Sequence, residues 1–247
     1  MKSKSVIILF LTILILDIFY PAYSDEFNFK VTELEITENA NIIKSINGGV
    51  VNTKNEEITI KADNFTYNKL TTLLEAEGNV RLVDKVADVV IESNQIFYLK
   101  NKEEIYTKGK SVALNGSDIQ IDADQYFKYN KLTSIMEAKG NVKLDDKNEN
   151  VIIYTNEIFY FINEEKIFTL GKTNIDFEDK YNMEGSDLTL LRNEMILSSK
   201  KDVIIVDSES NTYKLEQFQY SINQEILKGK NIVAITSDKE NKSDEFF

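Results

Sequence analysis

Apolar and polar residues alternate with a period of two along much of this chain. Between residues 74 and 82 every second residue is apolar or glycine, and the residues between them are mostly charged. Residues 136–144 show the same pattern. Successive side chains of a β-strand point to opposite faces, so this alternation predicts strands with one apolar and one charged face. We find no segment with the 3.6-residue period of an amphipathic helix.

The sequence also contains an internal duplication. Residues 67–82 read YNKLTTLLEAEGNVRL, and residues 129–144 read YNKLTSIMEAKGNVKL. A shorter period, half as long, lies within this duplication and is marked by regularly spaced glycines at Gly48, Gly78, Gly109, Gly140 and Gly171. The chain is therefore predicted to consist of repeats of about 31 residues.

Each repeat carries asparagine turn sites after runs of β-branched and aromatic residues. These sites are Asn68, Asn101, Asn130, Asn163, Asn193 and Asn223. Asparagine tolerates left-handed backbone angles and bonds its own backbone, as a chain reversal requires. Each repeat is thus predicted to hold two strands, which gives roughly 12 to 14 strands in total. The glycine of each repeat is predicted to mark a bend or bulge.

These features predict an all-β fold. Because nearly every connection is short, we expect a rolled or folded-over antiparallel stack of strands, extended along one axis, with an apolar interior. A parallel β-helix is the alternative geometry, but its repeats are usually nearer to about 20–25 residues.

The N-terminal segment, residues 1–24, has the layout of a signal peptide. Lys2 and Lys4 precede an apolar run over residues 6–16, and Ala22 and Ser24 fit the small positions of a cleavage site. An uncleaved anchor is the alternative. We expect one exported domain over residues 25–247.

Composition excludes several classes of function. The chain has no Cys and no His, so it lacks the residues of nucleophilic triads, imidazole or thiolate metal sites and disulfides. We expect no enzyme activity, no cofactor and no metal site. The net charge of −12 argues against nucleic-acid binding. Acidic pairs at 103–104, 145–146 and 164–165 sit at or beside predicted turns, where they are expected to form a solvated rim.

A doubled signature resembles a known family. The motif A-x-G-N-V occurs at 76–80 and at 138–142, each time after an Ala-Asp strand that begins at Ala62 or at Ala123. Together with the phase of the glycines, it resembles the OstA-like repeat of the lipopolysaccharide-transport proteins LptA and LptC and of the periplasmic N-terminal domain of LptD. The resemblance covers about residues 27–247. The stretches 191–199 and 227–229 look closest to the LptD domain.

The resemblance implies an elongated antiparallel β-jellyroll, open along one side, whose apolar trough holds the acyl chains of lipopolysaccharide. Such a protein would be a non-enzymatic periplasmic conduit associated with the outer membrane. The implied partners are lipopolysaccharide, other Lpt-type β-jellyroll proteins joined by edge-strand pairing, and an outer-membrane barrel component. No barrel sequence follows here, and the Cys-containing segments of some LptD proteins are absent. An LptA-like role and a truncated or split LptD domain both stay open. The length of the chain favours the second.

The apolar face of the two best-matched repeats supplies the candidate lipid-binding residues. They are Ile58, Ile60, Ala62, Leu74, Ala76, Val80 and Leu82 from the first copy, and Ile119, Ile121, Ala123, Met136, Ala138, Val142 and Leu144 from the second. Small Ala and Gly residues at the centre of each repeat favour an open interior. The alternative is a filled core in a structural β-repeat protein, such as an adhesin stalk or an envelope scaffold.

Charged residues and strand edges suggest further contacts. Arg81, Lys143, Arg192 and Lys228 are candidates for lipid phosphates near the trough mouth, although outward strand positions are charged in any soluble sheet. The N-terminal edge, about residues 27–37, is expected to dock onto a preceding β-repeat protein. The last strand edge is expected to be open to pairing as well.

Overall fold

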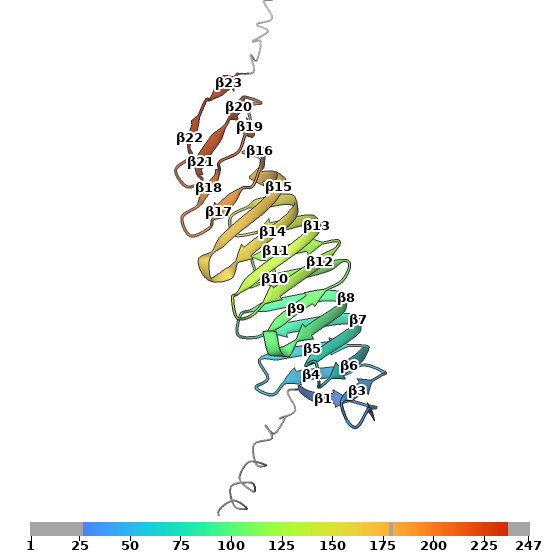
Figure 1. Ribbon diagram of the computed structural model, residues 1–247. Helices are drawn as coiled ribbons and strands as arrows, with labels where there is room; N and C mark the ends of the chain where they lie inside the picture. Colours follow the sequence, from blue (N-terminus) through green and yellow to red (C-terminus); the bar gives the residue numbers. More distant parts are fainter. Residues whose placement is uncertain (1–26, 178–179, 237–247) are drawn as a thin grey trace, which may run out of the picture.

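A computed structural model describes residues 27–177 and 180–236. The predicted signal peptide, residues 1–24, lies outside the described residues, as do residues 237–247. The described chain forms an elongated stack of antiparallel strands that progresses from the N-terminal to the C-terminal end (Figure 1). The all-β prediction is confirmed.

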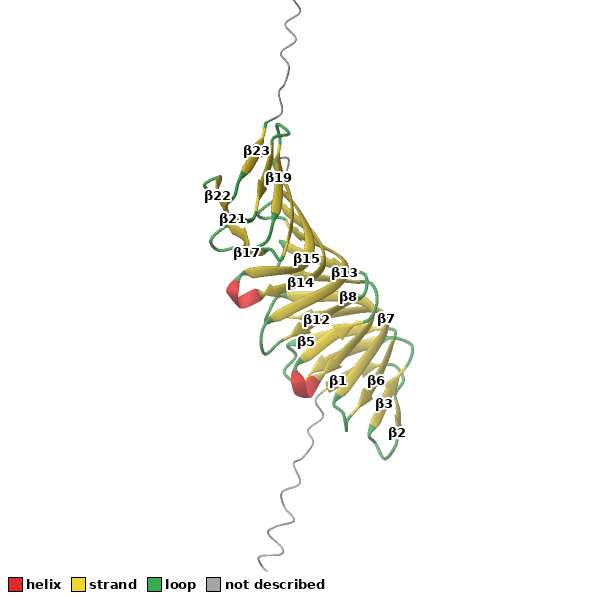
Figure 2. Cartoon of the chain, turned by 45° about the horizontal axis from the view of Figure 1, so that its top comes forward, coloured by secondary structure: helices red, strands yellow, loops and turns green. Residues whose placement is uncertain are grey.

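The strands run in chain order with short connections. Their bounds are β1 (Phe27–Val31), β2 (Glu35–Thr37), β3 (Ile42–Ser45), β4 (Gly49–Thr53), β5 (Ile58–Ala62), β6 (Asn64–Asn68), β7 (Leu73–Asp84), β8 (Val89–Leu99), β9 (Glu104–Thr107), β10 (Ser111–Asn115), β11 (Ile119–Ala123), β12 (Tyr126–Asn130), β13 (Ile135–Asp146), β14 (Val151–Phe161), β15 (Lys166–Phe177), β16 (Tyr181–Ser186), β17 (Thr189–Leu191), β18 (Ile196–Ser199), β19 (Val203–Asp207), β20 (Thr212–Leu215), β21 (Gln217–Ser221), β22 (Ile226–Lys230) and β23 (Val233–Ile235). Two 3₁₀ turns, η1 (Lys100–Lys102) and η2 (Ile162–Glu164), lie on the same side of the molecule (Figure 2).

Backbone pairing divides the strands into two walls. The first wall runs β1-β4-β5-β7-β8-β10-β11-β13-β14-β15-β16-β19-β20-β23. The second wall runs β2-β3-β6-β7-β8-β9-β12-β13-β14-β15-β17-β18-β21-β22. The long strands β7, β8, β13, β14 and β15 appear in both walls because each passes from one wall into the other. These five strands form the closed edge of the roll.

The A-x-G-N-V motif makes the bend at this closed edge. The register of β7 against β8 shifts between Glu77 and Val80, and β13 shifts against β14 at the equivalent place. Gly78 and Gly140 lie inside these bulges with φ of +78° and +88°, angles that favour glycine. The next residue, Asn79 or Asn141, donates its side-chain amide to the aspartate of the preceding Ala-Asp pair, at 2.8 and 3.0 Å respectively. The two halves of the sequence signature therefore contact each other in space.

The strand count differs from the expected 12 to 14. The described residues form twenty-three strands, because most strands of a repeat break in two where the chain turns from one wall into the other. The break between β5 and β6, at residues 62–64, is one example. On one side of it β5 pairs with a strand of the first wall, and on the other side β6 pairs with a strand of the second wall. The predicted positions of strands and turns are otherwise confirmed.

Candidate functional site

All fourteen candidate lipid-binding residues lie on the inner faces of the two walls. They come from β5, β7, β11 and β13, belong to one hydrophobic core, and are at most 4% exposed. Ala76 and Ala138 lie beside the bulges, at the narrow edge where the walls meet. The structure thus brings the two copies together on one interior surface. Contact of these residues with a lipid stays a prediction.

The two walls meet a second time, opposite the closed edge, along a line that we call the seam. It lies between the first-wall turns 85–88, 116–118 and 147–150 and the second-wall turns 69–72, 100–103, 131–134, 162–165 and 192–195. Backbone hydrogen bonds link each turn to its neighbour within its own wall. Lys100 N donates to Thr72 O at 3.0 Å in the second wall, and Gly116 N donates to Asp88 O at 2.9 Å in the first. Across the seam, the described chain joins the walls through side chains.

A row of tyrosines follows the seam on the second wall. Tyr67, Tyr98, Tyr129 and Tyr160 recur once per repeat and are at most 3% exposed. Burial, reinforced by the Asp84 carboxylate, raises the pKa of Tyr129. Burial also raises the pKa of Tyr160 to about 12. Both phenols are therefore neutral hydrogen-bonding groups at physiological pH, with rings in the interior and hydroxyls at the seam.

A cluster of charged side chains, which we call the first clasp, crosses the seam at Asp84. Its carboxylate is fully buried and lies 3.1 Å from the ammonium group of Lys131. The Tyr129 hydroxyl donates to the same carboxylate at 3.5 Å, and Glu57 lies 3.7 Å from Lys131. Asp84 also accepts the backbone N–H of Val86 at 3.0 Å, which fixes its own turn. The first clasp thus joins a first-wall turn to a second-wall turn.

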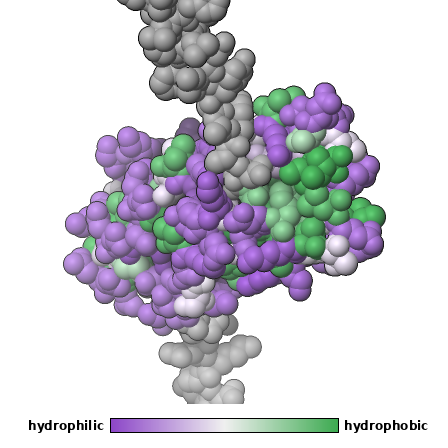
Figure 3. Space-filling view, turned by 90° about the horizontal axis from the view of Figure 1, so that it is seen from below, coloured by the Kyte–Doolittle hydropathy of each residue, from purple (hydrophilic) through white to green (hydrophobic). Residues whose placement is uncertain are grey.

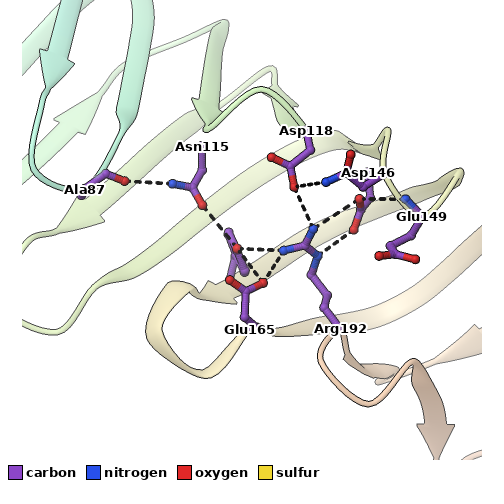
Figure 4. Close-up of polar contacts among 9 residues, drawn as sticks. Ala87, Asn115, Asp118, Asp146, Glu149, Glu165 and Arg192 are labelled. Atoms are coloured by element: carbon purple, nitrogen blue, oxygen red, sulfur yellow. Dashed lines mark hydrogen bonds and ion pairs between the residues drawn. The ribbon is translucent and has the colours of Figure 1, made fainter.

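A larger second clasp lies at the equivalent place in the second copy of the duplication. Arg192, from the turn after β17, donates Nε to Asp146 at 2.7 Å and Nη2 to Asp118 at 3.1 Å. Its Nη1 pairs with Glu165 and donates to the Tyr160 hydroxyl at 3.3 Å. Figure 4 shows the guanidinium lying between Asp118 and Asp146 on one side and Glu165 on the other. Burial alone would lower the pKa of Arg192, but its bonds to Asp146 outweigh this effect and raise the pKa. Arg192 is therefore a permanent cation in this cluster.

The clasps correct two expectations from the sequence. The acidic pairs do not form a merely solvated rim, because Asp146 is fully buried and Glu165 binds Arg192. Arg192 is also not an outward strand residue, since it lies in a turn with only 10% of its side chain exposed. Its contact with lipid phosphates stays a prediction. Arg81 and Lys143 do pair on the outer surface, with Glu92 and Asp145 respectively.

A sequence signal for the clasps exists but is incomplete. The acids Asp84 and Asp146 occupy equivalent positions in the two copies of the duplication. Lys131 and Arg192 make the same backbone turn bond, to Glu103 and Glu165 respectively, although Arg192 comes one residue earlier than the sequence offset of the duplication would place it. The alternation of apolar and polar residues within the strands does not predict which turn of one wall faces which turn of the other. The pairing therefore emerges only when both walls are built.

The interior opens into a hollow at the C-terminal end. A cavity of about 240 Å³ lies between the walls, with Met183 and Ile205 from the first wall and Tyr220 and Leu227 from the second. Tyr181, Tyr213, Asp207 and Glu225 complete its lining. We call this cavity the aromatic mouth.

No protein-family model matches the chain, and no curated protein matches it in sequence. Among solved structures it is similar to LptH of Pseudomonas aeruginosa, described as the LptA homologous periplasmic component of the conserved lipopolysaccharide transport device. The identity is 12% and the TM-score 0.23, over 73% of this chain and 94% of that one. A second similar structure is the TCP10 domain of Danio rerio CPAP in complex with a STIL peptide, at 8% identity and a TM-score of 0.18, over 83% of this chain and 99% of that one. None of the described helices is long and apolar enough to span a bilayer.

Proposed function

We propose that this chain is a non-enzymatic periplasmic carrier that shields the acyl chains of lipopolysaccharide in its interior during transit to the outer membrane. Two independent lines support the proposal. The doubled A-x-G-N-V signature resembles the OstA-like repeat, and its residues make the bend that folds one wall onto the other. The interior that results is apolar over the length of the described domain.

The observation that carries the proposal is the difference between the two edges of the roll. Hydrogen-bonded strands pass through the closed edge, so the walls cannot separate there without breaking the sheet. The seam is joined by side chains, which can separate while every strand keeps its backbone partners. A roll that opens along one edge can exchange its internal contacts for contacts with a lipid. Each methylene buried in this way contributes about 0.8 kcal/mol.

Both ends of the roll suit pairing with another β-jellyroll. At the N-terminal end, β1 pairs with β4 and β2 pairs with β3, so each presents a second edge. Leu34, Ile36 and Ile46 are exposed here, and Figure 3 shows an apolar patch on this end. At the C-terminal end, β22 pairs with β21 and β23 pairs with β20, and Val233 and Ile235 are exposed. Addition of a partner strand at either end would continue the interior from one molecule into the next.

Site-specific photocrosslinking in cells tests the proposal. A photoreactive amino acid at Ile121 replaces a buried inward side chain of β11, and the same residue at Asp122 faces outward on the same strand. We expect lipopolysaccharide adducts from Ile121 and none, or far fewer, from Asp122. Lipid extracted from the purified wild-type protein, identified by mass spectrometry, gives a second readout. Equal labelling at both positions, with no lipid extracted, would contradict the proposal.

A structural β-repeat protein with a filled core is the second candidate. The observation in its favour is that the fourteen candidate residues are packed against one another and are at most 4% exposed. In that event the seam never opens, and the photoreactive residue at Ile121 reacts with the protein's own side chains. The crosslinking experiment therefore separates the two functions.

A further inference from the structure

In each of four successive repeats, the last residue of one first-wall strand lies at the seam, and the polarity of this residue changes along the chain. At successive repeats this position holds Asp84, Asn115, Asp146 and then Phe177. The first three make polar contacts at the seam. Asn115 accepts the Tyr160 hydroxyl at 3.3 Å and donates to Ala87 O at 3.0 Å, between the two clasps (Figure 4). At the fourth position a ring takes the place of the polar group.

Phe177 packs against aromatic rings instead of ions. Its ring meets that of Tyr220, from the second wall, edge to face at 6.0 Å between centroids. Tyr181 meets Tyr220 in the same way at 5.5 Å. Such contacts contain no ion pair. This part of the seam therefore lacks the charge-assisted hydrogen bonds that join the two walls at the clasps.

The ion pair that joins the walls beside these rings is a weak one. Lys180 and Glu225 lie 3.3 Å apart, with 68% and 57% of their side chains exposed. Solvent screens such a pair strongly. In the clasps, by contrast, Asp84 and Asp146 are fully buried. Beyond Arg192, the described part of the seam thus has no buried ion pair that joins the two walls.

The aromatic mouth lies directly inside this weak section. Its walls are apolar at Met183, Ile205 and Leu227, while Asp207 and Glu225 provide a polar rim. An apolar hollow with a polar rim matches an amphiphile, whose chain enters and whose headgroup stays in water. Its volume of about 240 Å³ is just below the smallest typical ligand sites, roughly 300 Å³. It therefore suits part of a single hydrocarbon chain.

We propose that the aromatic mouth is the first binding site for an acyl chain, and that hydrocarbon reaches the clasped interior from this end and not sideways through the seam between Glu57 and Arg192. The inference rests on the proposed function and adds the place and direction of loading to it. The clasps then act as successive barriers, each of which has to open before a chain advances to the next pair of repeats.

Tryptophan reporters can locate the first contact, because the chain contains no Trp. Tyr213→Trp places a fluorophore at the mouth, where the side chain is half-buried. Phe127→Trp places one on β12, at an inward position between the clasps that is 1% exposed. The probe is an alkyl maltoside with bromine on its chain, which quenches tryptophan on contact. A neutral headgroup is chosen because Asp207 and Glu225 lie at the rim.

We expect the probe to quench Tyr213→Trp at concentrations at least about tenfold lower than Phe127→Trp. The unbrominated maltoside serves as the control for changes in fluorescence without contact. Adding Arg192→Gln and Lys131→Gln to the Phe127→Trp protein opens the clasps and should bring its quenching closer to that of the mouth reporter. If a single substitution fails to fold, Tyr181→Trp replaces the mouth reporter and Phe65→Trp the interior one.

The outcomes separate the inference from the proposed function. Quenching of Phe127→Trp at the same or lower probe concentration, with intact clasps, would show sideways entry and overturn the inference alone. Quenching of neither reporter, combined with no lipid adduct at Ile121, would overturn both. Quenching of neither reporter while Ile121 still yields lipid adducts would overturn the mouth as a chain-binding site.

Discussion

The guanidinium Nε of Arg192 lies 2.7 Å from the Oδ2 atom of Asp146, although the two residues are 46 positions apart and belong to opposite walls. Asp146 ends β13 in the first wall, and Arg192 follows β17 in the second. The contact therefore exists only when the roll is closed. Because the carboxylate is fully buried, an open roll would hydrate both groups, and a closed roll that lacks one of them holds an unpaired charge.

Loss of this cation should destabilise the closed roll. We expect Arg192→Met to lower the free energy of unfolding by about 3–5 kcal/mol, since Asp146 would stay buried without a counterion. Arg81→Met is the matched control, because the Arg81–Glu92 pair is about half exposed and should be worth about 1 kcal/mol or less. Urea denaturation followed by circular dichroism measures both. Similar losses for the two variants would mean that the second clasp contributes no more than a surface ion pair.

Alkaline pH should weaken the seam through Tyr160. Burial raises the pKa of Tyr160 from its ordinary value of 10.0 to about 12 in the folded chain. The unfolded chain releases this proton first, so the contribution to stability is complete below pH 10 and is lost as pH rises to about 12. We expect Tyr160→Phe to flatten the fall of stability over this window. Tyr154→Phe, which alters an exposed ring, is the control and should leave the slope unchanged. An unaltered slope in Tyr160→Phe would contradict the assignment.

The regularly spaced glycines should differ in their tolerance of a side chain. A Cβ atom at Gly140 would collide with the side chain of Gln125, whereas a Cβ atom at Gly109 would meet nothing within 4 Å. Both residues have positive φ, so each alanine variant costs about 1–2 kcal/mol of backbone strain. We expect Gly140→Ala to cost about 1–3 kcal/mol more, from crowding. Thermal unfolding of the two variants makes the comparison. Equal melting temperatures would show that Gln125 moves aside freely.

The strand edges should mediate association. Photocrosslinkers at the exposed Asn28 and Lys30 of β1 are expected to trap a second β-repeat protein in cells. In the purified protein, Val233→Lys at the other end should reduce self-association seen by light scattering over a concentration series. Leu132→Lys, in a seam turn away from both edges, is the control. A wild-type chain that stays monomeric throughout, with β1 recovering only lipid, would argue against edge pairing.

Local pattern and repetition predicted the fold because they report on single strands. The alternation at 74–82 specifies which face is apolar, and Asn68 and Asn130 accept backbone N–H bonds in the turns predicted for them. The clasps depend on closure of the roll, which brings together residues from different repeats. In a single repeat, Asp146 belongs to a polar turn and Arg192 precedes another, and both would be exposed to solvent. Their burial follows from the second wall folding over the first.

The spacing of the clasps sets a rule for how such a chain can change in length. Each wall grows by pairing one strand to the next, so an inserted repeat could in principle be accommodated anywhere along the stack. The charged first-wall residues at the seam, Asp84 and Asp146, stand two repeats apart, however, with the uncharged Asn115 midway. An insertion of two repeats would preserve the alternation of charged and neutral residues at the seam and add a third clasp. An insertion of a single repeat would put two charged or two neutral seam residues in neighbouring repeats. The natural step of elongation is therefore a pair of repeats.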